Sequence, residues 1–164
     1  MNSIIFIIVI VALFIVPFFV FGGGAKGKIK KALTASLIEL AQKNSCTISQ
    51  TEFWNHNIMG LSKDGNKLLF ATSSENLKKE TVVDLNTVKL SRVNITSRSG
   101  EGKASNLRVI EKITLVLEPN NGNSPTIELR IYDSEVDGIV LGNELQIAEK
   151  WALMTNEQIA ASNR

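Results

Sequence analysis

The sequence predicts an α+β protein in which helices precede and follow a set of antiparallel strands. Three observations lead to this prediction. The chain opens with a strongly apolar segment, because every charged residue lies at or beyond Lys26. Short alternating or β-branched segments, separated by turn residues, then fill the middle of the chain, as in antiparallel sheets. Apolar residues at helical spacing mark one segment before these strands and one after them.

The length of 164 residues leaves room for one globular domain behind the apolar start. A disulfide-stapled module is excluded, because Cys46 is the only cysteine. Nucleic-acid binding is not expected, because the net positive charge comes from residues 26–43 and the rest of the chain is faintly acidic. We expect an anchor with a glycine hinge, a basic amphipathic helix, a β domain with a final helix, and a tail. These parts cover residues 1–25, 26–45, 46–158 and 159–164.

The segment Ile4–Phe21 contains 18 consecutive apolar residues. As a helix it would span roughly 27 Å, close to the ~30 Å hydrocarbon core of a bilayer. It therefore predicts a transmembrane helix that acts as a signal anchor in a single-pass membrane protein. The alternative is a cleaved signal peptide, which would leave the domain outside the cytoplasm or secreted.

Basic residues follow this apolar segment and none precedes it. The positive-inside rule then places the globular domain in the cytosol. The same lysines are predicted to lie at the membrane surface, where anionic lipids attract them. These are Lys26, Lys28, Lys30 and Lys31.

Residues 28–43 are rich in helix-forming residues. Ile29, Leu33, Leu37 and Leu40 recur every three or four positions and form one apolar stripe. We expect this stripe to pack on the chain's own domain. The alternatives are a helix that lies on a membrane surface and a helix that mediates self-association.

The middle of the chain contains the strand signals. Asp64-Gly65-Asn66 stands between two apolar runs, 58–63 and 67–72, which predicts a β-hairpin. Residues 81–85, 88–95, 107–117 and 126–132 are also β-like, with a bulge expected near Arg92. Residues 144–159 then predict a second amphipathic helix with Trp151 on its apolar face.

This order of elements resembles the pleckstrin-homology (PH) superfold. The resemblance rests on the strands from Phe53 to Tyr132 and on the helix segment 148–153 with its tryptophan, and it covers residues 46–158. It implies a bent sandwich or barrel of about seven strands that the final helix closes, with the tryptophan as a packing residue. The first hairpin loop holds only Lys63 and Lys67 beside Asp64, so inositide binding is not carried over. Another α+β sandwich or a small β-barrel is the competing architecture.

An acidic segment between the last strand and the last helix has the spacing of a calcium-binding loop. Its carboxylates and a turn glycine occupy positions 1, 3, 5, 6 and 12 of such a loop. The candidate metal ligands are Asp133, Glu135, Asp137 and Glu144. Against calcium, the segment follows a strand and its ninth position is apolar. An acidic turn into the helix explains the same residues.

We expect no enzyme and no cofactor. His56 is the only histidine and has no motif partner for nucleophilic or zinc chemistry. Phe53 and Trp54 beside it are candidate partner contacts if they are exposed. The sequence thus predicts a membrane-anchored scaffold module, with the lipid bilayer and an unidentified protein or peptide as partners, and with self-association through its first two helices as a further option. The alternatives are a calcium-binding envelope domain and a structural subunit of a membrane complex.

Overall fold

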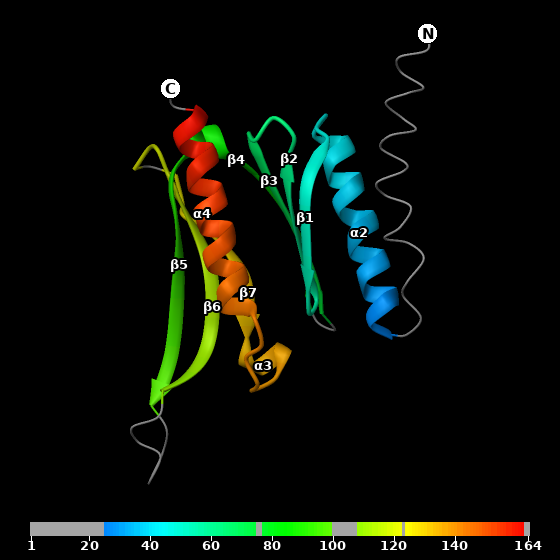
Figure 1. Cartoon of the computed structure of the whole chain (residues 1–164), viewed down its shortest axis with the longest axis vertical. Coiled ribbons are helices and arrows are strands. Elements are labelled where there is room, and N and C mark those ends of the chain that lie inside the picture. Colours follow the sequence, from blue (N-terminus) through cyan, green and yellow to red (C-terminus); the bar gives the residue numbers. More distant parts are fainter. Residues whose placement is uncertain (1–24, 75–76, 100–107, 123, 163–164) are drawn as a thin grey trace.

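The computed structural model describes residues 25–74, 77–99, 108–122 and 124–162 (Figure 1). Its seven strands form two antiparallel sheets, one of four strands and one of three. The first sheet consists of β1 (Ile48–Trp54), β2 (Asn57–Ser62), β3 (Lys67–Ser74) and β4 (Leu77–Asp84). The second consists of β5 (Val88–Ser99), β6 (Arg108–Pro119) and β7 (Ile127–Asp133). The helices are α2 (Ala25–Lys43), the short α3 (Ser134–Asp137), α4 (Glu144–Ser162) and a 3-10 turn η1 (Leu85–Thr87).

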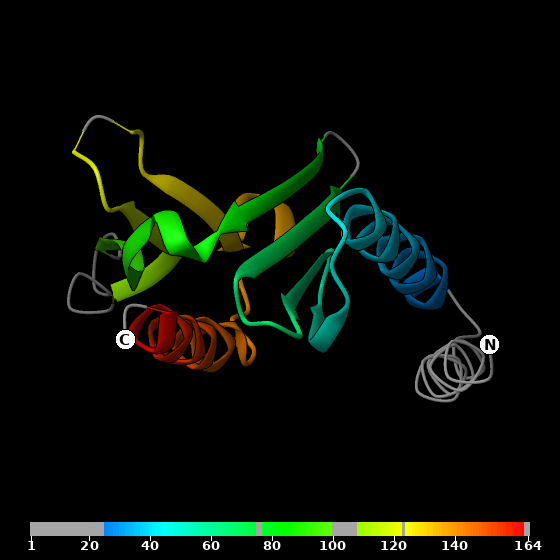
Figure 2. The ribbon, with the colours of Figure 1, turned by 90° about the horizontal axis from the view of Figure 1, so that it is seen from above.

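The main core lies between the two sheets and α4. Met59 and Phe70 from the first sheet meet Ile113 and Leu115 from the second, and all four side chains are at most 2% exposed. Trp151 enters the same cluster from α4 and is 1% exposed. Figure 2 shows α4 and α2 at opposite sides of the fold. The final helix therefore completes a core that the two sheets alone would leave open to water.

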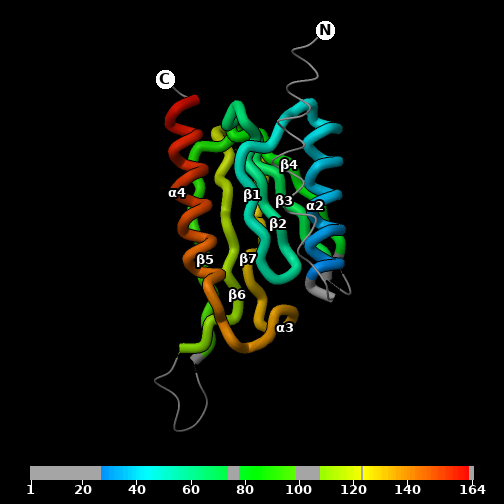
Figure 3. Tube along the Cα trace, turned by 45° about the vertical axis from the view of Figure 1, so that its right-hand side comes forward, coloured from blue at the N-terminus to red at the C-terminus, as the bar shows by residue number. Residues whose placement is uncertain are grey.

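A second, smaller core joins α2 to the outer face of the first sheet. Leu33 and Leu37 are each 1% exposed and pack with Ile58 and Leu69. Gly60 permits this close approach, because a Cβ there would lie 3.0 Å from Cδ2 of Leu37. The predicted apolar stripe thus packs on the chain's own domain, and Figure 3 shows α2 lying along the first sheet.

The β2–β3 hairpin forms where the Asp-Gly pair predicts it. Gly65 has φ 72°, a conformation that glycine adopts without strain. The backbone N–H of Lys67 donates to Ser62 Oγ at 2.9 Å, and that of Asn66 donates to Asp64 Oδ1 at 3.2 Å. The bulge expected near Arg92 lies elsewhere, because the β5–β6 register shifts between Val88 and Leu90 and again between Thr96 and Ser97.

The predicted membrane topology requires a correction. Within the residues that the structure describes, no helix is long and apolar enough to cross a membrane. Both long helices carry charges, such as Lys31 and Glu39 in α2, because each has one face in water. The prediction of a transmembrane helix, a signal anchor and a single-pass membrane protein with a cytosolic domain is therefore withdrawn. The segment Ile4–Phe21 itself lies outside the described residues.

Candidate functional site

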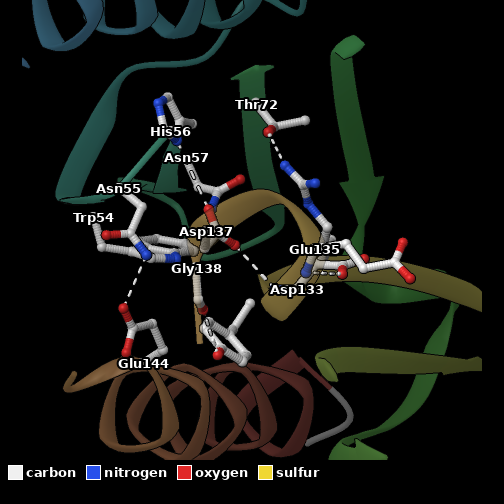
Figure 4. A network of polar contacts seen from close by, with 12 residues as sticks. Trp54, Asn55, His56, Asn57, Thr72, Asp133, Glu135, Asp137, Gly138 and Glu144 are labelled. Carbon is white, nitrogen blue, oxygen red and sulfur yellow. Dashed lines mark hydrogen bonds and ion pairs between the residues drawn. The ribbon is translucent and has the colours of Figure 1, made fainter. Parts of the chain in front are cut away.

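The chain between β7 and α4 folds back on itself through its own carboxylates. Asp133 ends β7 and caps α3, because its Oδ1 accepts the backbone N–H of Glu135 at 3.2 Å. Asp137 ends α3 and returns the contact, since its Oδ2 accepts the backbone N–H of Asp133 at 2.9 Å. The side chain of Asp137 has no exposed surface. These bonds close α3 into a tight turn (Figure 4).

His56 approaches the same buried carboxylate from the β1–β2 turn. Its Nδ1 lies 3.7 Å from Asp137 Oδ1, which is too long for a hydrogen bond. Neither atom has a hydrogen-bond partner, although both are buried. In the described part of the chain, no hydroxyl or thiol is hydrogen-bonded to His56. The pair therefore has the geometry of a polar packing contact between two turns.

Glu144 ties the β1–β2 turn to the start of α4. Its Oε1 accepts the side-chain N–H of Asn55 at 2.8 Å, and its Oε2 accepts the backbone N–H of Gly142 at 2.6 Å. The residue is only 5% exposed, so these bonds are sheltered from water. A carboxylate at the first turn of α4 also favours the helix dipole. The loop before α4 is thus fixed at its far end.

Tyr132 fixes the near end of this loop. Its buried hydroxyl donates to the carbonyl oxygen of Gly138 at 2.7 Å. Burial raises the pKa of Tyr132 above its usual range, and the nearby carboxylates of Glu144, Asp137 and Asp133 raise it further. Both effects oppose formation of the negative phenolate.

We expect the phenol to titrate at higher pH in the folded protein than in the unfolded chain. Tyr132 is the only tyrosine, so ultraviolet absorbance during an alkaline titration reports it alone, and Tyr132→Phe provides the blank. The folded state holds this proton more tightly, so its stability declines as pH rises from about 10 towards the raised pKa. Equal midpoints in buffer and in denaturant would contradict this expectation.

A second group of polar contacts joins the first sheet to β7. The carbonyl oxygen of Ile131 accepts from Trp54 Nε1 at 2.7 Å and from Asn57 Nδ2 at 3.4 Å. Arg130 donates to Thr72 Oγ1 at 3.2 Å. These bonds connect positions that are 58 to 77 residues apart, and sequence reasoning missed them because no local pattern marks such pairs.

The structure does not gather the candidate calcium ligands into a metal site. Among the described residues, no group of three or more His, Cys, Asp or Glu side chains is placed to hold a metal ion. Asp133 and Asp137 lie together but bond to backbone N–H groups, and Glu144 bonds to Asn55 and Gly142. Glu135 is exposed on α3. The acidic residues therefore shape the turn into the last helix.

The candidate partner contacts lie inside or beside the cores. Trp54 is 5% exposed and tilts against Phe70 at a ring separation of 6.4 Å. Phe53 is half-buried against the second core, and Lys30 Nζ lies 5.8 Å from its ring. Their role as partner contacts remains a prediction, as does the membrane-surface role of the lysines. Lys28 and Lys31 are exposed on α2, while the side chain of Lys26 lies outside the described residues.

The tip of the loop between α3 and α4 is apolar and exposed. Ile139 is 79% exposed and Val140 is 87% exposed, and Val136 just before them is 41% exposed. Gly138 begins the tip with φ 90°, which turns the chain outward. The sequence showed these residues only as part of an acidic loop, because exposure depends on where the loop points.

Together, the fold and this loop define a small α+β protein of two antiparallel sheets with an anchored, apolar surface loop. Comparison with known proteins found no matching family model, no matching curated protein and no matching solved structure.

Proposed function

We propose that the chain is a non-enzymatic module that binds an extended protein or peptide segment along the outer edge of β4. An edge strand has a row of unpaired backbone N–H and C=O groups, and an added strand can pair with them. The observation that carries the proposal is a difference between the edges of the two sheets. Side chains close the edges of β5 and β7. The first sheet has two outer strands: β1 is tied to α4 through Glu52, whereas β4 pairs with β3 and has no such contact with another element among the described residues.

The β5 edge is closed by Asn156 of α4. Its Oδ1 accepts the backbone N–H of Ser91, and its Nδ2 donates to the carbonyl oxygen of Ser91, both at 2.8 Å. The side-chain amide thus occupies the place where the backbone of another strand would bind. On β7, Trp54 and Asn57 hold the carbonyl oxygen of Ile131 in a similar way.

The β4 edge carries charged side chains that oppose aggregation, and it leaves space for a partner strand. Lys78, Lys79 and Glu80 are exposed at its start, and charges of this kind discourage edge-to-edge aggregation. Thr81 and Val82 are only partly buried and continue the edge. A separate strand that carries acidic side chains opposite the lysines would pair with this edge at little risk of self-pairing.

We also propose that the scaffold is related to the PH superfold, and the order of elements supports this. Seven strands are followed by a final helix with a buried tryptophan, which is the order that the resemblance implies. The relationship is a proposal about the scaffold, and it assigns no ligand to this chain.

Peptides selected from a random display library against the full chain would test the function. We expect the selected peptides to protect backbone amides of β4 from hydrogen–deuterium exchange. The matched control is Asn156→Ala, which opens the β5 edge and should leave the affinity of these peptides unchanged. A library that yields no binder, or binders that protect other elements, would refute the proposal.

A further inference from the structure

The two most exposed large apolar residues, Ile139 and Val140, lie in a loop at one end of the molecule (Figure 1). This end holds the start of α2, the end of β5, the start of β6, and the loop between α3 and α4 (Figures 1 and 3). Val136 in α3 and Val109 near the start of β6 add side chains that are 41% and 36% exposed. Apolar side chains as exposed as those of this loop favour a contact surface.

Exposed basic side chains lie at the same end. In the described part of the chain, no salt bridge involves Lys28 or Lys31 at the start of α2, or Arg108 at the start of β6, and all three are exposed. The neighbouring carboxylates are mostly engaged: Asp133 lies 3.2 Å from Lys112, and Glu111 lies 3.2 Å from Arg98. Glu135 is the exposed exception on α3. The surface therefore favours an anionic partner.

The apolar tip is held in place before any partner arrives. Tyr132 bonds to its first residue, Gly138, and Glu144 bonds to Gly142 behind it. Because the loop is already fixed, binding costs little further conformational entropy. The burial of the apolar side chains at the tip therefore contributes almost fully to the binding free energy. The basic side chains are spread over several elements around the protruding tip. Such an arrangement fits the flat, fluid surface of a lipid bilayer better than a shaped pocket in a protein.

We propose that this end of the molecule docks on the surface of a lipid bilayer that contains anionic headgroups. Ile139 and Val140 enter the acyl boundary, while Lys28, Lys31 and Arg108 contact the headgroups. The contact is peripheral and needs no spanning helix. This contact goes beyond the proposed function, because the partner is a lipid surface instead of a peptide and the residues involved lie outside β4.

Tryptophan fluorescence in the full chain can locate this contact. The native Trp54 and Trp151 are buried, so their signal is a constant background that the unmodified protein measures. Val140→Trp places a reporter at the tip, and Leu153→Trp places a matched reporter on α4 at a site that is 63% exposed. Phosphatidylcholine vesicles with brominated acyl chains, with and without phosphatidylglycerol, are the probes. Because quenching requires contact, adsorption through any other part of the chain does not quench the tip.

We expect quenching of the tryptophan at position 140, but not at 153, and only in vesicles with phosphatidylglycerol. Replacing Lys28 or Lys31 by glutamine should weaken partitioning about fivefold for each lysine. Replacing Ile139 and Val140 together by serine should weaken partitioning on the order of tenfold or more.

Equal quenching at both positions, quenching without anionic lipid, or no quenching at 140 would each overturn the proposal. So would a photocrosslinker at position 140 that labels protein instead of lipid in cells. Peptide binding at β4 is measured separately, so either proposal can fail alone.

Discussion

Replacing Trp151 by alanine is expected to destabilise the fold more than any other single change considered for this protein. The side chain is 1% exposed and lies in the core between the two sheets and α4. Its Nε1 also donates to Glu52 Oε2 at 2.7 Å, which links α4 to β1. Truncation of a buried tryptophan costs about 3–5 kcal/mol. Domains of this size are stable by only about 5–15 kcal/mol, so the variant approaches the unfolding threshold.

Urea unfolding followed by circular dichroism measures this loss in the full chain. Leu153→Ala on the same helix is the matched control, because Leu153 is 63% exposed and its loss should change the unfolding free energy by less than about 0.5 kcal/mol. Trp151→Phe keeps most of the packing but removes the N–H donor, so an intermediate loss is expected. If Trp151→Ala and Leu153→Ala unfold at the same urea concentration, α4 does not complete the core as described.

Local sequence signals predicted those elements whose cause is local. The Asp-Gly pair gave the β2–β3 hairpin, and the helical spacing of Leu33, Leu37 and Leu40 gave α2. β1 was not predicted as a strand, because residues 49–51 in it are all exposed and its burial does not alternate. α3 was missed as well, since a single turn of helix has too few residues to show a period.

The candidate site shows a different limit of sequence reasoning. The spacing of Asp137 and Glu144 made them candidate calcium ligands, with an acidic turn as the alternative, because only their spacing was visible. In the structure Glu144 bonds to Asn55, which is 89 residues away, and Asp137 lies beside His56. Partners so distant are brought together by the packing of the two sheets. The apolar tip has the same origin, because the bonds at its two ends decide that Ile139 and Val140 point outward.

Truncation of Leu37 is expected to have the second largest effect, with a loss of about 2–5 kcal/mol in unfolding free energy. Leu37 is 1% exposed, and its Cδ2 lies close to Gly60, which has no side chain to fill the space that alanine leaves. The same variant tests whether α2 unfolds together with the main core in one cooperative unit. If it does, Leu37→Ala must weaken the main core as well, although Leu37 belongs to the smaller one.

Two spectroscopic signals separate these outcomes. Circular dichroism follows all helices, whereas the fluorescence of Trp54 and Trp151 follows the main core alone. We expect both signals of Leu37→Ala to shift together to lower urea, because one cooperative unit unfolds in a single step. Gln42→Ala, at an exposed position of α2, should leave both unchanged. If only the circular dichroism of Leu37→Ala shifts, α2 unfolds independently, and its first turns would not hold Lys28 and Lys31 in a fixed position beside the apolar tip.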